Sequence, residues 1–226
     1  MSRTAASRKN PRGRPKDEAL TARRCEEILD AAARLFARVG YPSTDIQVLA
    51  DELGVGKGTV YRYFPSKEAL FLAAVDRGMR RLRDQVHGEA EEASDPLEQV
   101  ASAIRSYLAF FDANPDIVEL LIQERAEFKD RKKPTYFEHR DANIGRWLDL
   151  FRGLIASGRM RVAPPEEFTE TISDLLYGTI FTNHFAGRRE SLEVQARRIL
   201  DTLFLGMLSD AERGQNRGAS ERKRNS

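Results

Sequence analysis

The stretch that decides the fold runs from residue 44 to residue 64 and reads TDIQVLADELGVGKGTVYRYF. Thr44 and Gln47 stand three residues apart in the pattern of a capping box, which predicts that a helix begins here. The apolar residues that follow repeat at helical spacing and give this helix one buried face: Ile46, Leu49, Ala50 and Leu53. Gly54 suits the left-handed conformation that ends many helices, so a sharp turn is expected after it.

A second short helix is expected directly after this turn. It carries Val60 and Phe64 inward, four residues apart on one face. Its other faces are basic, aromatic or polar, with Lys57, Thr59, Tyr61, Arg62 and Tyr63. Ala50, Gly54 and Val60 have the spacing of a close helix crossing, a tight turn and an apolar plug, which indicates a helix-turn-helix. The alternative is an ordinary helical hairpin inside an all-α core.

Two longer stretches around this motif resemble the TetR family of transcriptional regulators. Residues 54–71, GVGKGTVYRYFPSKEALF, are similar to the turn, recognition helix and fourth-helix start of that family. Upstream, RRCEEILDAAARLFARVGYPSTDIQVLADELG resembles its first two helices. The close resemblance covers residues 22–82 and implies a three-helix DNA-binding domain there, with the helix-turn-helix at residues 45–64. It also implies a helical ligand-binding and dimerisation domain over residues 83–210.

Two residues depart from the family pattern. Gly56 stands where many relatives carry Ser or Thr, and Tyr63 stands where a His is common. A missing hydroxyl at Gly56 removes one side-chain contact to DNA and leaves more to the backbone N–H groups at the helix N-terminus. The departures bear on operator preference and not on the fold.

The second helix of the motif is expected to enter the major groove of double-stranded DNA, and two copies would read a palindrome. We expect phosphate contacts from Thr44, Lys57, Tyr61, Tyr63 and Lys67. Base edges would be read by Thr59 and Arg62, since Arg can donate two hydrogen bonds to guanine. Gly58 lies between these side chains and belongs to the same DNA-binding surface.

The charge of the chain supports a nucleic-acid partner for its first part. The net charge is only +2, but residues 1–81 hold 16 Lys and Arg against 10 Asp and Glu, and the remaining residues hold 21 against 25. The N-terminal part is therefore the one suited to a polyanion. A single cysteine, Cys25, excludes an intrachain disulfide and fits a reducing compartment. No apolar run is long enough to span a bilayer, so a cytoplasmic protein without membrane contact is expected.

Both ends of the chain are polar and basic. Residues 1–20 are expected to form a disordered arm, and residues 211–226 a disordered tail. Within the arm, residues 11–15 read PRGRP and resemble an AT-hook, in which Arg12 and Arg14 would lie in a narrow minor groove. The alternative is a generic basic tail that attracts phosphates without selectivity.

The rest of the chain predicts an all-α fold. Further helices are expected over residues 21–39, from Ser66 toward Gly88, after Asp95, after Asn114, and from Thr135 to Gly158. The last two, over residues 166–186 and 191–208, are apolar on more than one face. Such helices need neighbours on each face, and the resemblance implies that the neighbour is a second copy, giving a homodimer. The alternative is a more enclosed monomer core.

Nothing in the sequence indicates catalysis, a metal or a cofactor. There is no nucleophile motif, phosphate loop or Cys cluster, and the three histidines are far apart. The family resemblance implies a pocket for a small-molecule effector, and its candidate residues are Tyr107, Phe111, Arg140, Trp147, Phe151, Tyr177, Phe181 and His184. Aromatic stripes are also typical of ordinary cores, and Arg140 has the alternative of a salt bridge.

These observations predict a ligand-responsive, homodimeric repressor that binds a palindromic operator. One alternative is a ligand-independent architectural DNA-binding protein, which the AT-hook-like arm favours. Another is an enzyme or sensor whose chemistry uses His139 and His184.

Overall fold

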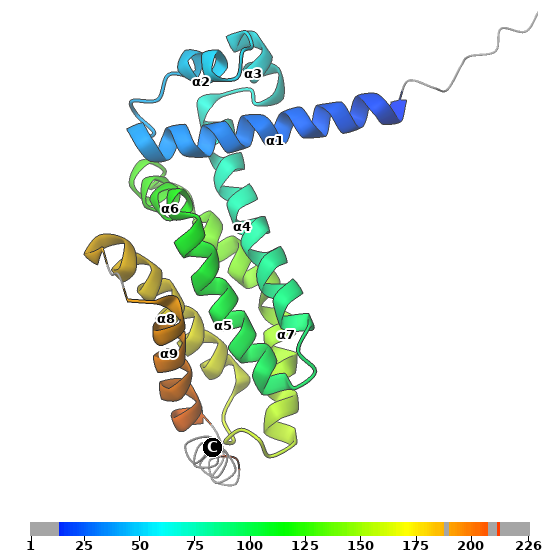
Figure 1. The fold of residues 1–226 in the computed structure, drawn as a ribbon, viewed down its shortest axis with the longest axis vertical. Coiled ribbons are helices and arrows are strands. Elements are labelled where there is room, and N and C mark those ends of the chain that lie inside the picture. Colours follow the sequence, from blue (N-terminus) through cyan, green and yellow to red (C-terminus); the bar gives the residue numbers. More distant parts are fainter. Residues whose placement is uncertain (1–13, 188–189, 208–211, 213–226) are drawn as a thin grey trace, which may run out of the picture. The chain divides into compact units, whose positions relative to one another are not determined.

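The computed structural model describes residues 14–187, 190–207 and 212. The described residues form nine α-helices, and no strand is found among them. The helices are α1 (Arg14–Val39), α2 (Ile46–Glu52), α3 (Lys57–Tyr63), α4 (Lys67–Glu91), α5 (Pro96–Ala113), α6 (Pro115–Glu127), α7 (Thr135–Ala156), α8 (Pro165–Ala186) and α9 (Leu192–Met207) (Figure 1). The predicted all-α class is confirmed.

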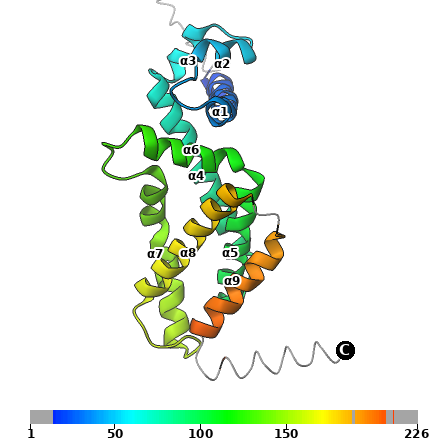
Figure 2. The ribbon, with the colours of Figure 1, turned by 90° about the vertical axis from the view of Figure 1, so that its left-hand side faces the viewer.

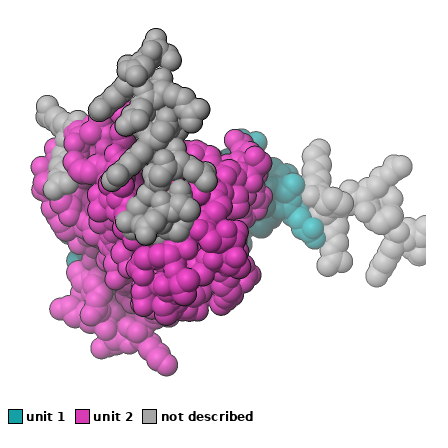
Figure 3. Space-filling model, turned by 90° about the horizontal axis from the view of Figure 1, so that it is seen from below, with its two compact units in different colours: residues 1–74 teal, residues 75–226 magenta. Residues whose placement is uncertain are grey.

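The chain divides into two compact units, residues 1–74 and 75–226, coloured separately in Figure 3. The division falls inside α4, whereas the sequence places the end of the first domain near residue 82. The part of α4 after Ala74 belongs to the second unit and packs within it. A Cβ added at Gly78 would lie 2.8 Å from the Ile117 side chain of α6, so the two helices are close there.

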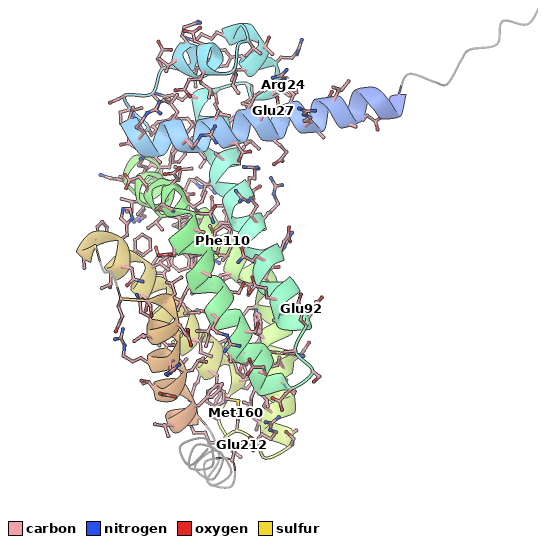
Figure 4. All side chains as sticks on the ribbon, viewed as in Figure 1. Arg24, Glu27, Glu92, Phe110, Met160 and Glu212 are labelled. Carbon is pink, nitrogen blue, oxygen red and sulfur yellow. The ribbon has the colours of Figure 1, made fainter. Side chains whose placement is uncertain are left out.

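The first unit is built on α1. The apolar pattern of this helix predicts burial of Ile28, Leu35, Phe36 and Val39. The first three are buried, but Val39 is 40% exposed and does not belong to the core. The ring of Phe36 lies 5.0 Å from that of Phe71 on α4. On the outer surface, Arg24 and Glu27 form an ion pair of 2.9 Å (Figure 4).

The start of α1 corrects one expectation about the N-terminal arm. The helix begins at Arg14, earlier than the predicted start at Thr21, so the predicted disordered arm does not extend to residue 20. Pro is a common residue in the first turn of a helix, so Pro15 is compatible with this start. Arg12 and the rest of the AT-hook-like segment before Arg14 lie outside the described residues.

In the second unit, α5 occupies the centre. It contacts α6, α7, α8 and α9, and Figures 1 and 2 show it among them. Buried residues occur all around this helix, among them Leu97, Ile104, Leu108 and Phe110. Phe110, labelled in Figure 4, is 2% exposed. A helix that is apolar on every side is stable only when surrounded.

Candidate nucleic-acid interface and effector cavity

The helix-turn-helix forms as its spacing predicts. Ala50 and Val60 are 0% and 1% exposed and lie between α2 and α3. The backbone N–H of Val55 donates to the carbonyl of Ala50 at 2.9 Å, and Gly54 has φ of +63°, the left-handed conformation required by the turn. Phe64 is also buried, so the inward face of α3 is confirmed.

The start of α2 differs from the prediction. Asp45, not Thr44, is the N-cap, and its carboxylate accepts from the backbone N–H of Gln47 at 2.8 Å. Thr44 is 5% exposed, and its hydroxyl donates to the carbonyl of Gly40 at 2.7 Å. The carbonyl at the end of α1 is a nearby acceptor, so this hydroxyl is used within the fold. The expected phosphate contact of the Thr44 side chain does not agree with its burial.

The outward side of α3 presents an open, mixed surface. Gly58, Tyr61 and Arg62 are exposed, while Thr59 and Tyr63 are half-buried. The guanidinium carbon of Arg62 lies 5.5 Å from the centre of the Tyr63 ring. These predicted DNA-binding residues therefore share one accessible element.

Two lysines beside this surface are already engaged within the first unit. Lys57 pairs with Asp45 at 3.1 Å, and both side chains are largely exposed. The Gln47 backbone N–H and then Lys57 lower the pKa of Asp45. The Lys67 ammonium donates to the carbonyls of Tyr41, Pro42 and Thr44 at 2.9, 3.1 and 3.2 Å. Because an ammonium has three hydrogens, Lys67 holds this loop, and its contact with phosphate stays a prediction.

The second unit has a partly open cavity of about 160 Å³ between α4, α5, α7 and α8. Its walls are mainly apolar and aromatic, with contributions from Met79, Leu82, Val86, Val100, Ile104, Ile144, Trp147, Phe151, Ile172 and Leu176. A concave, largely apolar space with a few polar groups is the usual form of a small-molecule site.

Two buried phenols form one polar group of this cavity. The hydroxyl oxygens of Tyr107 and Tyr136 lie 2.9 Å apart in a hydrogen bond. Burial raises the pKa of Tyr107 well above its ordinary value, and burial raises the pKa of Tyr136 to about 12. Both hydroxyls therefore stay protonated at neutral pH and remain hydrogen-bond donors.

Charged and titratable groups also line the cavity. His139 bonds through Nε2 to Asp76 of α4 at 2.7 Å. The Nε of Arg140 donates to Asp141 at 3.0 Å, so the salt bridge weighed as an alternative is present. His87 lies edge-on to Trp147, with ring centres 6.0 Å apart. Burial, and then the charge of Arg146, lowers the pKa of His87.

A second cavity of about 250 Å³ lies between α5, α6, α8 and α9. Phe111, Asn183, His184 and Gln195 line it. The Nε2 of His184 lies 3.3 Å from a carboxylate oxygen of Glu119.

The chain has clear relatives among known proteins. The family model for bacterial regulatory proteins of the tetR family matches residues 28–74. LmrA, a helix-turn-helix-type transcriptional regulator of Bacillus subtilis (strain 168), is 33% identical over 156 residues, which are 69% of this chain and 83% of LmrA. This chain belongs to the TetR family. Five other curated relatives are matched over 39% to 63% of their own length. Among them, YerO of the same organism is 31% identical over 114 residues, or 50% of this chain.

Solved structures show the same fold. The fatty acid degradation regulator FadR from Bacillus halodurans gives a TM-score of 0.69 at 18% identity, covering 88% of this chain and 97% of FadR. A transcriptional regulator from Saccharomonospora viridis in complex with choline gives 0.68 at 23% identity, covering 83% of this chain and 99% of its own. The TetR-family fold thus extends through both units.

The predicted effector residues divide between three places in this TetR-family fold. Tyr107, Arg140, Trp147 and Phe151 line the first cavity, whereas Phe111 and His184 line the second. Tyr177 and Phe181 line neither; their rings lie 4.7 Å apart, and Tyr177 packs on Tyr136. The reason is the direction of the α8 face that carries them, which the apolar pattern of that helix does not show.

The predicted effector residues omit seven polar or aromatic residues that line the first cavity: Arg83, His87, Tyr136, His139, Asn143, Thr169 and Ser173. One signal was available, because Tyr136 and Arg140 are four residues apart and lie on one helical face. Among the described residues, no group of three or more His, Cys, Asp or Glu is placed to hold a metal ion. No helix in the described ranges is long and apolar enough to cross a membrane.

Proposed function

We propose that this TetR-family chain is a homodimeric, effector-responsive repressor that binds a palindromic operator. The observation that supports the proposal is the accessible outer face of α3, in a helix-turn-helix whose inner apolar residues are buried. Thr59 and Arg62 would read base edges, and Lys57, Tyr61 and Tyr63 would contact phosphates around them. On binding DNA, Lys57 would leave its ion pair with Asp45 and pair with a phosphate instead. The Lys57–Asp45 pair is exposed, and exposed pairs are weak enough to be replaced.

Dimerisation would use α8 and α9. Several large apolar side chains stay exposed on these helices: Leu175, Phe185, Val194 and Leu205. Phe185 is 71% exposed and Leu205 is 61% exposed, which is costly for an isolated unit. Burial against a second copy, the commonest assembly of soluble proteins, removes this cost.

The effector would act through the first cavity and α4. Met79, Leu82 and Val86 of α4 line the cavity, while Leu70 and Phe71 of the same helix are buried in the first unit. A molecule that shifts α4 on binding therefore changes how the DNA-binding unit is held. By linkage it would weaken DNA binding, typically by about 1 to 3 kcal/mol. The regulators named for fatty acid degradation and crystallised with choline support a small-molecule effector.

The proposed protein is a regulator and not an enzyme, and it needs no cofactor. Its proposed place of action is the cytoplasm, where regulators of this family bind DNA. The relatives support this view, since they are transcriptional regulators.

Nuclease footprinting on the DNA that flanks the gene tests the proposal. We expect a footprint with two-fold symmetry, and a loss of about 1 to 3 kcal/mol of binding free energy for Arg62→Ala at the preferred site. Arg23→Ala is the matched control, because Arg23 is an exposed arginine of α1 paired with Glu27. An asymmetric footprint would contradict the dimer, and affinity indifferent to sequence would favour an architectural protein.

A further inference from the structure

The first cavity has a charge preference. Among the described residues that line it, two are arginines and two are histidines, and none is Asp or Glu. The carboxylates that pair with these groups, such as Asp76 and Asp141, lie outside the lining. A cationic ligand would therefore be desolvated without a carboxylate partner, which is costly. The lining favours a neutral or anionic molecule.

The phenol pair offers a donor to such a molecule. Tyr107 and Tyr136 carry two hydroxyl hydrogens, and one of them lies between the two oxygens. The other has no acceptor among the described residues. Burial keeps the pKa of both groups high, so this hydrogen is present at neutral pH. The pair can therefore donate this hydrogen to an acceptor oxygen of a ligand.

Arg140 adds a positive charge near the same end of the cavity. It stands one helical turn after Tyr136, on the same side of α7. Its Nε donates to Asp141 and its guanidinium lies 4.9 Å from the centre of the Phe137 ring, while no hydrogen bond of its terminal N–H groups is found among the described residues. Its side chain is 29% exposed, which leaves it partly desolvated. Phenol and guanidinium together form a hydrogen-bonding surface suited to a carboxylate.

Around the phenol pair the lining is mainly apolar and aromatic. Ile144 lies about two turns beyond Tyr136 on α7, roughly 12 Å along the helix, and Ile104 lies one turn before Tyr107 on α5. Farther along α7, Trp147 lines the space beside His87 of α4. The phenols therefore have apolar side chains within reach of a short hydrocarbon.

We propose that the effector of this cavity is a small apolar monocarboxylate, a medium-chain or aromatic acid. Its carboxylate accepts from the Tyr107–Tyr136 pair and from Arg140, and its hydrocarbon lies against Ile104 and Ile144, which line the space within about two turns of the phenols. The volume of about 160 Å³ is close to that of an engineered cavity, roughly 150 Å³, that holds benzene. A body of about six to ten carbons is therefore the expected size. The assignment rests on the proposed effector function and names its chemical class.

Calorimetry on the full-length protein without DNA tests the class. Octanoate and phenylacetate are the acidic probes, 1-octanol is the neutral one, and octylamine and choline are the cationic ones. We expect octanoate to bind roughly tenfold to a hundredfold more tightly than 1-octanol, the effect of hydrogen bonds to a charged group. The cations should give no binding heat. Equal or tighter binding of 1-octanol, octylamine or choline would overturn the assignment.

Variants test the residues. Tyr107→Phe/Tyr136→Phe and Arg140→Gln should each weaken octanoate at least about tenfold while leaving 1-octanol within about twofold. Tyr177→Phe and Arg152→Gln are matched controls, a tyrosine and an arginine of α8 and α7 outside the cavity lining. Thermal melts identify variants that fail to fold. Arg140→Lys, which keeps the charge, should restore part of the octanoate affinity, and unchanged affinity in Arg140→Gln would contradict the role of Arg140.

The two proposals fail separately. A gel shift on the footprinted DNA reports the regulator, and calorimetry reports the ligand class. If DNA binding responds only to non-acidic compounds, the monocarboxylate is wrong and the regulator stands. If the protein binds octanoate but no DNA, the proposed function falls instead.

Discussion

Lys67 is a basic residue that follows α3 in the chain and is bonded within the first unit. Its three hydrogens are donated to the carbonyls of residues 41, 42 and 44, and it lies 4.7 Å from the centre of the Tyr41 ring. A sequence shows the charge but not the carbonyls around it. The residue therefore stabilises the loop between α1 and α2.

Lys67→Ala should lower the free energy of unfolding by about 1 to 3 kcal/mol, because hydrogen bonds to a charged group are lost. Lys57→Ala serves as the comparison, since it removes only an exposed ion pair, worth about 0 to 1 kcal/mol. Urea denaturation measures both. A Lys67 variant with unchanged stability and weakened DNA binding would show that the residue contacts phosphate after all.

Gly56 is the N-cap of α3, and its backbone conformation does not require a glycine. Its φ of −75° and ψ of 146° are accessible to any residue, and a Cβ there would meet no atom within 4 Å. Ser at this position could accept a hydrogen bond from the first turn of α3.

Gly56→Ser should therefore raise the free energy of unfolding by about 0.4 to 1 kcal/mol, partly by restricting the unfolded chain. Gly54→Ser should do the opposite, because Gly54 has φ of +63°. Chemical denaturation compares the two. Destabilisation by Gly56→Ser would mean that its backbone conformation is not the one described.

At the scale of elements, the N-terminus of α7 is capped by a side chain of another helix, α6. Glu124 of α6 is 1% exposed, and its Oε1 accepts from the backbone N–H and the hydroxyl of Thr135 at 3.0 and 2.7 Å. The sequence pattern pairs Thr135 with Glu138 instead. Glu138 is bonded to Arg131, so the local capping box does not form. Because Glu124 and Thr135 are joined only by folding of the loop, local pattern cannot identify this cap.

Glu124→Ala should lower the free energy of unfolding by about 2 to 4 kcal/mol, because the donors of Thr135 are left buried. Glu138→Ala is the matched control and should cost under about 1 kcal/mol. Thermal or urea unfolding gives both values. A larger loss of stability for Glu138→Ala than for Glu124→Ala would indicate that Thr135 and Glu138 form the capping box instead.

The helices themselves were predictable in kind and nearly in extent. Asp95 caps α5 by accepting from Leu97 and Glu98, as its sequence pattern predicts. Apolar periodicity and most helix caps depend on residues that are close in the chain, and so they can be recognised in the sequence. The direction in which Tyr177 points, and hence which aromatic residues meet in a cavity, depends on helix packing and could not be predicted.

For the whole molecule, the exposed apolar side chains of α8 and α9 lead to a prediction about assembly. Phe185→Glu combined with Leu205→Glu should convert a dimer into a monomer of 25.6 kDa, because two charges would be buried at the interface. Sedimentation at micromolar concentration measures the mass. Val162→Glu is the control, as Val162 is 90% exposed but lies between α7 and α8. A wild-type chain that sediments as a monomer would contradict the dimer.

The continuity of α4 has a consequence for recombination between regulators. This helix is one uninterrupted segment from Lys67 to Glu91, and the division between the units falls within it. One inserted residue turns every later side chain by about 100°. Met79, Leu82 and Val86 would then leave the cavity wall. Exchanges of sensor units across this helix should therefore succeed only when they preserve its residue count, which makes helical phase a constraint on how such chains can diversify.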